Sequence, residues 1–277
     1  MAPLARNDPL DPSALGRGPL RRAVHFLAEC ESTNDEARTL ALAGEPEGAL
    51  VLADYQTAGR GRLGRAWQAP RGSSLLFSTL LRPPLAPELA LQAVMAASLG
   101  VMHGIRRETG LPARLKWPND VLIREKKAGG ILCELGFDGG RLDYVIVGIG
   151  LNVNFDPREV DGIPPDAAGI QSELGRSIPR TALLQAMLEE METRYAEILR
   201  GTSLRGAWER ALDTVGRRVK VVLSDGEIVG TAERVEETGA LVVRLDDGAA
   251  RTILAGDVVH LTIDDRPSTI GNEKPIP

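Results

Sequence analysis

Cysteine and histidine are scarce in this sequence of 277 residues, which contains two cysteines and three histidines. Cys30 and Cys133 are too few for a disulfide framework or a cysteine-ligated zinc site. We therefore expect both to be reduced thiols that pack as small apolar groups. His25, His103 and His260 show no metal-ligand spacing, so we expect structural or surface roles for them.

Long apolar runs and an excess of positive charge are also missing. No hydrophobic stretch approaches the ~20 residues that span a bilayer, and residues 1–20 lack the apolar core of a secretory signal. The formal net charge of −5 argues against the broad basic surface that carries most nucleic-acid binding. These absences predict a cytoplasmic protein with neither a membrane nor DNA as a partner.

Hydrophobic residues make up 43% of the chain, which is enough for one large core and a small satellite domain. From about Gly216, alternating apolar positions and Asp-Gly turns predict a small β-module. We expect a proline-rich disordered arm over 1–21, a main domain over 22–214, the β-module over 215–264 and a disordered tail over 265–277.

The hydrophobic period of the main domain changes repeatedly between that of a strand and that of a helix. Apolar runs predict strands over Ala23–Ala28, Ala49–Gln56, Ser74–Arg82, Arg114–Trp117, Gly130–Phe137 and Tyr144–Val153. Recurrences of three and four residues predict helices over Ser32–Ala43, Ala90–Thr109 and Thr181–Leu199. The fold class that follows is α+β, with a mixed β-sheet core flanked by helices.

Positive charge is concentrated in Thr57–Trp67, TAGRGRLGRAW, which we call the arginine loop. Its glycines allow a ligand to approach the backbone closely, while Arg60, Arg62 and Arg65 offer planar charged groups that suit phosphate or carboxylate. It is not a Walker A loop, because no Gly-Lys-Ser/Thr follows, nor a dinucleotide-binding fingerprint. The alternative is a solvated surface loop or an RNA-contacting segment.

The stretch Leu115–Asp120, LKWPND, combines turn residues with charge. Taken alone, it is a turn between two strands with Trp117 in the core. As a site, it places Lys116 at a strand end facing a phosphate. Asn119 and Asp120 would then be oxygen ligands of Mg²⁺ or orienting groups near it.

Glycines stand at three further places where a ligand could lie. Lys127 precedes Gly129 and Gly130, which form either a tight turn or an opening onto bare backbone. Gly148–Asn154, GIGLNVN, is either a bulged strand or a strand whose glycines admit a ligand. Ser32–Glu36, STNDE, fits a helix capping box and a ligand contact equally well.

Five motifs, in this order along the chain, closely resemble those of biotin protein ligases over roughly Phe26 to Asn154. They are STN, Q-x-x-GRGRLGR-x-W, KWPND, K-x-GGILCE and GIGLNVN. The β-module resembles the family's small SH3-like barrel in position and size. The resemblance implies a core like that of class II synthetases and biotin–lipoyl ligases, acting on ATP and biotin with Mg²⁺. Biotin's carboxylate would attack the α-phosphate of ATP, giving biotinyl-5′-AMP and pyrophosphate. A lysine of a biotin carboxyl carrier protein domain, part of a biotin-dependent carboxylase, would then take the biotinyl group.

The resemblance also implies roles for individual residues. The biotin site would comprise Ser32, Thr33, Asn34, Gln56, Gly59, Arg60, Gly61, Arg62, Lys127, Gly129, Gly130 and Gly150. The ATP and adenylate site would comprise Arg60, Arg62, Arg65, Trp67, Lys116, Asn119, Lys127 and Asn152. The expected catalytic groups are Lys127, Arg62 and Lys116. The expected metal ligand is Asp120, for Mg²⁺.

Two rival functions stay open. A lipoate or octanoate transferase shares the superfold and a related lysine, but would not be expected to carry the arginine loop. A non-catalytic binding module is disfavoured by the presence of both Lys116 and Lys127. Some family members repress the biotin operon through an N-terminal helix-turn-helix, which the proline-rich stretch before Ser32 cannot form. We therefore expect a monofunctional ligase, as a monomer or weak homodimer. Asp257 and Asp264 belong to the β-module, which we expect to help hold ATP or the carrier, and we predict no role of their own for these two residues.

Overall fold

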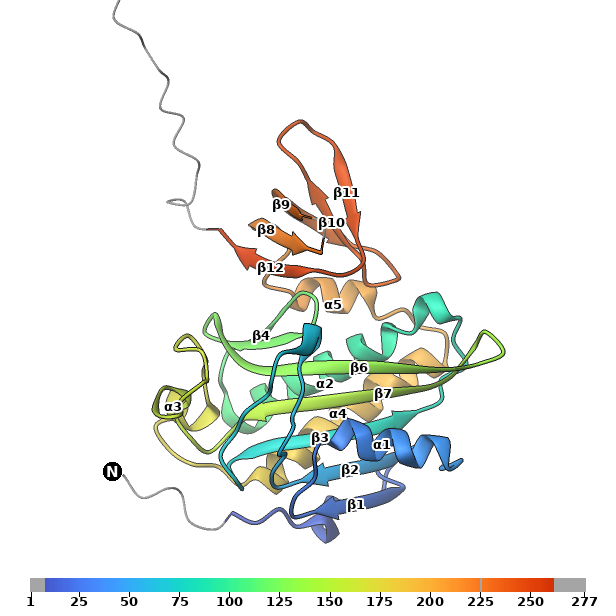
Figure 1. Cartoon of the computed structure of the whole chain (residues 1–277), viewed down its shortest axis with the longest axis vertical. Coiled ribbons are helices and arrows are strands. Elements are labelled where there is room, and N and C mark those ends of the chain that lie inside the picture. Colours follow the sequence, from blue (N-terminus) through green and yellow to red (C-terminus); the bar gives the residue numbers. More distant parts are fainter. Residues whose placement is uncertain (1–7, 225, 262–277) are drawn as a thin grey trace, which may run out of the picture.

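The computed structural model describes residues 8–224 and 226–261 (Figure 1). A seven-stranded mixed sheet with the order β1-β2-β3-β7-β6-β5-β4 forms the centre of the main domain. Its strands are β1 (Ala23–Leu27), β2 (Ala49–Ala53), β3 (Ser74–Leu81), β4 (Ala113–Lys116), β5 (Asp120–Ile123), β6 (Lys126–Asp138) and β7 (Arg141–Asn152). β1 and β2 are parallel, and the other neighbours are antiparallel. The predicted α+β class is confirmed.

Helices cover both faces of this sheet. In Figure 1, α1 (Thr33–Leu42) lies in front of it, whereas α2 (Gln92–Thr109) and α4 (Arg180–Leu199) pack on each other behind it. The side chains of β2 alternate between these two faces. Val51 joins the small core beneath α1, whereas Leu50 and Leu52 join the main core. Two shorter helices, α3 (Ile170–Leu174) and α5 (Arg205–Ala211), complete the domain.

The α2 segment is apolar on nearly every side. Within the described chain, Pro87–Thr109 is the one helical stretch with the length and composition to cross a membrane, but 78% of its apolar window is buried inside the protein. Gly100 and Gly104 bring its backbone against α4, where an added Cβ would collide with Met191 and Met187. Helices that pack this closely belong to a protein core.

Each predicted strand and helix is present, with ends shifted by a few residues. β6 begins at Lys126, so Lys127 lies in a strand and not in a hairpin loop. Likewise Gly129 and Gly130 are strand residues and do not form a tight turn. The short elements β5, α3 and α5 were not predicted, because four to seven residues carry too little periodic signal.

The predicted disordered arm is wrong for residues 8–21. They include a short 3-10 helix, η1 (Pro12–Leu15), which packs on α4. Leu10, Leu15 and Leu20 are buried, and their apolar side chains anchor the segment in spite of its prolines. Residues 1–7 and the predicted tail over 265–277 lie outside the described part of the chain.

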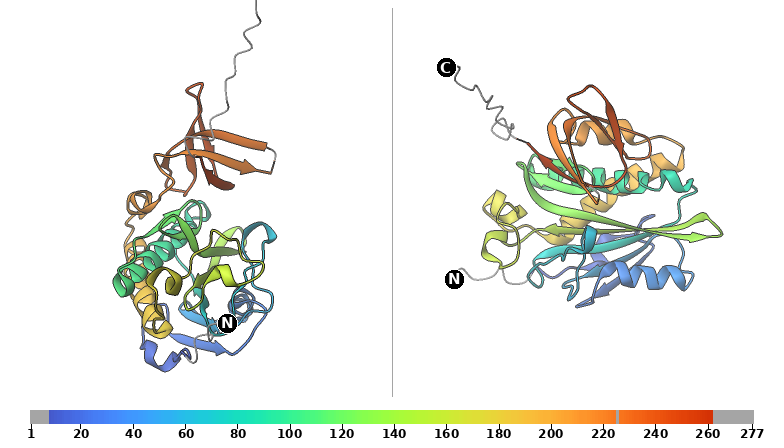
Figure 2. Two further views of the ribbon diagram at one scale, coloured as in Figure 1. Left: turned by 90° about the vertical axis from the view of Figure 1, so that its left-hand side faces the viewer. Right: turned by 45° about the horizontal axis from the view of Figure 1, so that its top comes forward.

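The C-terminal module is a five-stranded antiparallel sheet with the order β11-β10-β9-β8-β12, as the predicted small β-domain requires. Its strands are β8 (Arg218–Leu223), β9 (Gly226–Val235), β10 (Leu241–Arg244), β11 (Ala250–Ile253) and β12 (Asp257–His260). The module sits beside the β4 end of the main sheet (Figure 2). Trp117 lies at this junction, where its indole N–H donates to the carbonyl of Gly239 at 2.9 Å. The module is therefore joined to the main domain next to the KWPND turn.

Candidate functional site

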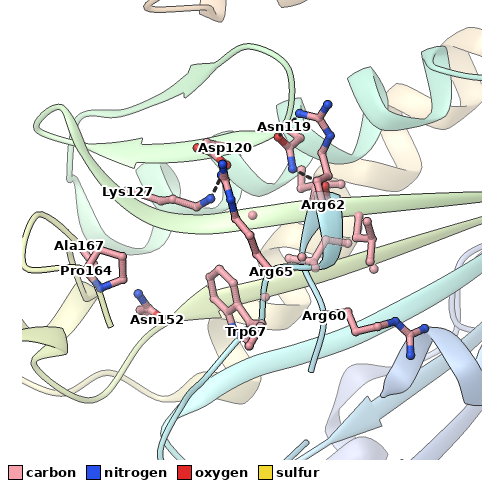
Figure 3. A pocket seen from close by; sticks show the side chains of 18 of the residues that line it. Arg60, Arg62, Arg65, Trp67, Asn119, Asp120, Lys127, Asn152, Pro164 and Ala167 are labelled. Atoms are coloured by element: carbon pink, nitrogen blue, oxygen red, sulfur yellow. Dashed lines mark hydrogen bonds and ion pairs between the residues drawn. The ribbon is translucent and has the colours of Figure 1, made fainter. Parts of the chain in front are cut away.

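A pocket of about 600 Å³ opens between the main domain and the C-terminal module. Residues of the arginine loop, the β4–β5 turn, β6 and β7 line it (Figure 3). Of the predicted site residues, those that line it are Ser32, Thr33, Asn34, Gln56, Arg60, Gly61, Arg62, Arg65, Trp67, Lys116, Asn119, Asp120, Lys127, Gly130, Gly150 and Asn152. Segments far apart in the sequence thus contribute to one cavity.

Gly59 and Gly129 are the two predicted site residues that do not line the pocket. A Cβ on Gly59 would lie 2.6 Å from the carbonyl oxygen of Trp67. A Cβ on Gly129 would lie 2.9 Å from the carbonyl oxygen of Gly150. Both glycines permit close backbone packing beside the pocket, and this explains them without a ligand.

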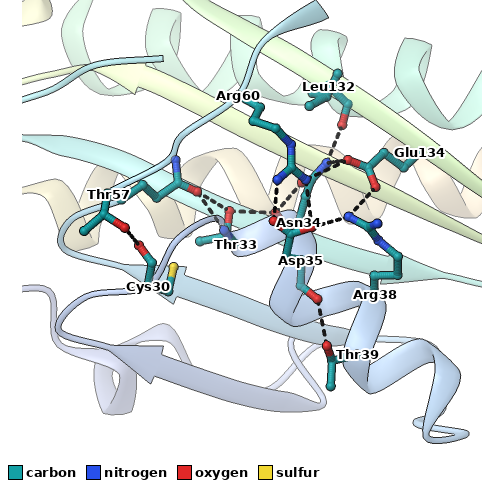
Figure 4. Close-up of polar contacts among 12 residues, drawn as sticks. Cys30, Thr33, Asn34, Asp35, Arg38, Thr39, Thr57, Arg60, Leu132 and Glu134 are labelled. Carbon is teal, nitrogen blue, oxygen red and sulfur yellow. Dashed lines mark hydrogen bonds and ion pairs between the residues drawn. The ribbon is translucent and has the colours of Figure 1, made fainter. Parts of the chain in front are cut away.

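Buried polar groups cluster at the start of α1, at one end of the pocket (Figure 4). Ser32 stands at the N-cap position but makes no capping hydrogen bond through its side chain. Instead, Gln56 Oε1 accepts from the backbone N–H of Thr33 at 2.7 Å and from its hydroxyl at 3.0 Å. The Ser78 hydroxyl lies 2.8 Å from Thr33 Oγ1 and 2.7 Å from Asn34 Oδ1. The predicted capping box is therefore replaced by tertiary contacts from β3 and from the residue that precedes the arginine loop.

The guanidinium of Arg60 is turned toward an acidic pair, Asp35 and Glu134 (Figure 4). Its guanidinium pairs with Asp35, with Nη2 to Oδ1 at 2.8 Å, and lies 3.5 Å from Glu134. The hydrogen bond from Arg60 lowers the pKa of the Asp35 carboxyl. The charge of Arg60 is thus matched by two carboxylates, and the contact ties the start of the arginine loop to α1.

Arg62 and Arg65 reach the C-terminal module instead. Arg62 Nη1 donates to Asn119 Oδ1 and to the carbonyl of Gly256, both at 3.3 Å, and lies 3.9 Å from the Asp257 carboxylate. Arg65 pairs with the same carboxylate. Burial lowers the pKa of the Arg62 guanidinium, and Asp257 opposes the shift. Asp257 therefore holds the arginine loop across the mouth of the pocket, a role that its place in the sequence did not indicate.

Lys127 and Asp120 form an ion pair inside the pocket, with Nζ to Oδ1 at 2.6 Å (Figure 3). Adjacent antiparallel strands bring them together, because Lys127 of β6 lies opposite Leu122 of β5 and Asp120 is two residues before Leu122. The described residues contain no group of three or more His, Cys, Asp or Glu that could hold a metal on its own. One carboxylate beside a lysine suits a Mg²⁺ ion that enters with phosphates and keeps several of its waters.

Lys116 ends β4 and lines the pocket on the side of the C-terminal module. Its charge also acts on His260 of β12. Burial, and after it Lys116, lowers the pKa of the His260 imidazole to about 4. Among the described residues, His260 Nε2 lies 3.2 Å from Thr214 Oγ1, which agrees with the structural role predicted for this histidine.

The indole of Trp67 lies across the glycines of β6 and β7. A Cβ on Gly150 would lie 2.6 Å from this ring, and one on Gly130 would lie 3.5 Å from it. The Trp67 indole N–H is buried and has no hydrogen-bond partner within the described structure. The buried Oδ1 of Asn152 is likewise unpartnered there. Among the buried side-chain atoms of the described residues, the pocket thus presents a free donor from Trp67 and a free acceptor from Asn152 beside an aromatic face.

Three contributions to the pocket were not predicted. One is Ser78, which does not line the pocket itself but holds Thr33 and Asn34 there. Together with Thr79 it interrupts the apolar run of β3, and that interruption is a signal that could have identified it. Another is the loop from Gly162 to Ala167, which a bridge between Lys127 and Ala167 holds against β6. The third is β12 with Asp257. The last two come from non-local contacts, for which a local motif gives no sign.

The two cysteines take no part in the pocket. Both are free thiols. Burial raises the pKa of Cys133 to about 12 and that of Cys30 to about 11, so neither is a thiolate near neutral pH. The prediction of two thiols that form no disulfide is confirmed.

Comparison with known proteins relates both parts of the chain to one family. Residues 28–152 match the biotin/lipoate A/B protein ligase family, and residues 214–261 match the biotin protein ligase C terminal domain. The chain is 35% identical over 268 residues to a biotin–acetyl-CoA-carboxylase ligase of Mycobacterium tuberculosis, covering 91% of this chain and 96% of the relative. It is 34% identical over 230 residues to the bifunctional ligase/repressor BirA of Bacillus subtilis, covering 82% of this chain and 70% of that protein.

Solved structures show the same relationship. The biotin protein ligase from Aquifex aeolicus in complex with biotin and ATP superimposes with a TM-score of 0.71 and 31% identity, covering 86% of this chain and 98% of the other. The mixed sheet and the small C-terminal β-domain are common to both. The chain therefore belongs to the biotin protein ligase family.

Proposed function

We propose that both steps of biotin attachment take place in the pocket between the main domain and the C-terminal module. The protein is an ATP-dependent ligase that activates biotin as biotinyl-5′-AMP and passes the biotinyl group to a carboxylase. The observation that carries the placement is the convergence of the arginine loop, Lys116, Lys127 and the buried polar cluster on one cavity.

The end of the pocket at the start of α1 is the proposed biotin site. Thr33, Asn34 and Gln56 are buried or half-buried polar groups held by one another and by Ser78, and such preorganised groups suit a neutral, hydrogen-bonding headgroup. The backbone at Gly130 and Gly150 leaves room beside it for a ring. The biotin carboxylate would then extend toward Lys127.

The charged end is the proposed ATP site. A carboxylate and a triphosphate repel each other, so their approach needs several cations that are already in position. Lys127, Lys116, Arg62 and Arg65 supply these, and Asp120 would turn from Lys127 to a Mg²⁺ ion that enters with ATP. The free indole N–H of Trp67 is a proposed donor to the nucleotide.

The reaction then proceeds in two balanced steps. An oxygen of the biotin carboxylate attacks the α-phosphorus, the bond to the bridging oxygen breaks, and pyrophosphate leaves. In the second step an uncharged lysine amine of the carrier attacks the carbonyl of biotinyl-AMP. AMP leaves, an amide forms and the amine gives up a proton. The positive charge of Lys127 stabilises the phosphate oxygens in both steps.

The acceptor and the setting of the enzyme are also proposals. We propose a biotin carboxyl carrier protein domain as the acceptor, since the relatives are named for acetyl-CoA carboxylase. We also propose a monofunctional cytoplasmic ligase that acts as a monomer or weak homodimer. The acidic net charge supports the absence of DNA binding in this proposal. We retain a boundary near 214–215 between the catalytic domain and the module, and place residues 8–21 with the catalytic domain because they pack on α4.

The test is transfer to a carrier domain. Purified protein is incubated with Mg·ATP, biotin and a biotin carboxyl carrier protein domain, and the acceptor lysine is examined by mass spectrometry. We expect biotin on that lysine, and none on a matched carrier in which the lysine is replaced by arginine. Attachment of lipoate but not biotin to a carrier would overturn the proposal.

A further inference from the structure

Arg180, the first residue of α4, is only 1% exposed and lies outside the pocket lining. A buried guanidinium is costly unless its charge and donors are matched, so its partners show what it holds together. Its Nη2 lies 3.0 Å from the Asp54 carboxylate, and its Nη1 donates to the carbonyl of Ser74 at 2.9 Å. Its Nε and Nη2 also donate to the carbonyl of Asp8, at 3.2 and 2.5 Å. Three separate segments therefore meet at one side chain.

Two of these segments are the ends of the stretch that carries the arginine loop. Asp54 directly follows β2, and Ser74 is the first residue of β3. The N–H of Gly72 donates to the carbonyl of Asp54 at 3.0 Å and closes the stretch at its base. Every residue of the arginine loop, and Gln56 before it, lies between the two contacts of Arg180. A shift of either end would move the residues that line the pocket.

Asp8 supplies the third segment. Its carboxylate accepts from the backbone N–H of Arg180 at 2.6 Å and from Asn154 Nδ2 at 3.3 Å. The backbone N–H of Asn154 donates in turn to the carbonyl of Ser73 at 2.7 Å, next to the base of the loop. One carboxylate of the N-terminal segment thus completes the site around Arg180.

We propose that Arg180, held by Asp8, is a positioning residue for the arginine loop. It fixes both ends of the loop so that Arg62 and Arg65 are placed to close over the adenylate. Because Arg180 does not line the pocket, its effect on ligands passes through the base of the loop. This inference depends on the proposed function for its ligand, but the positioning itself can be measured without one.

A second buried arginine provides a matched control. Arg21 is 7% exposed, pairs with Glu192 of α4 at 3.2 Å and donates to the carbonyl of Leu15 at 2.6 Å. It joins the same N-terminal segment to the same helix but has no hydrogen bond or ion pair with Asp54 or Ser74. Arg21→Lys should therefore disturb the packing without loosening the loop.

The test variants are Arg180→Lys and Asp54→Asn. Lysine keeps the charge but has a single nitrogen, which cannot bridge Asp54, Ser74 and Asp8 together. Asp54→Asn removes one charge at the base of the loop with little change in shape, and serves if Arg180→Lys does not fold. Thermal unfolding of each variant confirms that folded protein is compared.

Two rates are measured on the full chain. Trypsin cleavage after Arg60, Arg62 and Arg65, read by mass spectrometry without ligand, reports opening of the loop. Release of biotinyl-AMP reports closure over the intermediate. We expect both test variants to raise both rates by at least about tenfold, the ratio that corresponds to about 1.4 kcal/mol, and Arg21→Lys to stay within about twofold.

Similar rates in the test variants and in Arg21→Lys would overturn the inference, as would unchanged loop cleavage in Asp54→Asn. The proposed function fails separately, if the wild-type protein forms no biotinyl-AMP. In that case a difference in loop cleavage alone would still establish that Arg180 positions the loop.

Discussion

Replacing Arg62 by alanine should release biotinyl-AMP from the active site. Arg62 is the loop arginine that reaches across the pocket mouth. Its side chain is 22% exposed, and its Nη1 lies 3.3 Å from Asn119 Oδ1. A charge-assisted hydrogen bond to a ligand phosphate contributes about 1.5–3 kcal/mol, and each 1.4 kcal/mol is about a factor of ten. We therefore expect the release rate of the intermediate to rise about 10- to 100-fold.

The assay forms biotinyl-AMP on the enzyme, removes free ATP and biotin, and follows the free intermediate by chromatography. Arg60→Ala is the matched control, because the charge of Arg60 is already matched by Asp35 and Glu134 and the substitution should change release far less. Arg65, 65% exposed, should give a smaller effect than Arg62. An unchanged release rate in Arg62→Ala, or an equal rise in Arg60→Ala, would refute the reasoning.

Three further predictions concern the lysine, a glycine and a histidine. Lys127→Met should lower kcat/KM for biotin-dependent pyrophosphate release by about 100- to 1,000-fold, with unfolding little changed; full activity would contradict it. Gly150→Ala should displace the Trp67 ring, because its Cβ would lie 2.6 Å away, and raise KM for ATP more than it lowers kcat. The pKa of His260 is lowered from 6.5 to about 4 in the folded protein. Its contribution to the free energy of unfolding is therefore fully present above pH 6.5 and is lost as the pH falls toward 4, by at most about 3 kcal/mol. Urea unfolding of His260→Gln should show a flatter pH dependence, and an unaltered slope would exclude this histidine as the cause.

Much of the site could be predicted because its residues lie in short local motifs. KWPND and GIGLNVN place their polar groups within a few residues of a strand end, and the arginine loop lies in the connection between β2 and β3. Strands are recognisable by their period. The fold then brings these strand ends together. This is why nearly all predicted residues line one pocket.

What could not be predicted depends on contacts between distant segments. Asp257 faces Arg62 and Arg65 across 192 residues or more of chain, and no local pattern marks it. Arg60 lies in the same short motif as Arg62 and Arg65, yet its guanidinium pairs with Asp35 and Glu134 and theirs lie near Asp257. The N-terminal segment was misjudged for a related reason: its prolines suggest disorder, whereas its burial depends on leucines that contact α4.

Pyrophosphate release from Mg·ATP by the purified protein tests the proposed adenylation most directly. The protein is offered biotin, lipoate, octanoate or no acid in parallel, with Lys127→Met as a matched control. We predict release that depends on biotin and is lost in the variant. Release with lipoate or octanoate in place of biotin, or no release with any acid, would contradict biotin activation in this pocket.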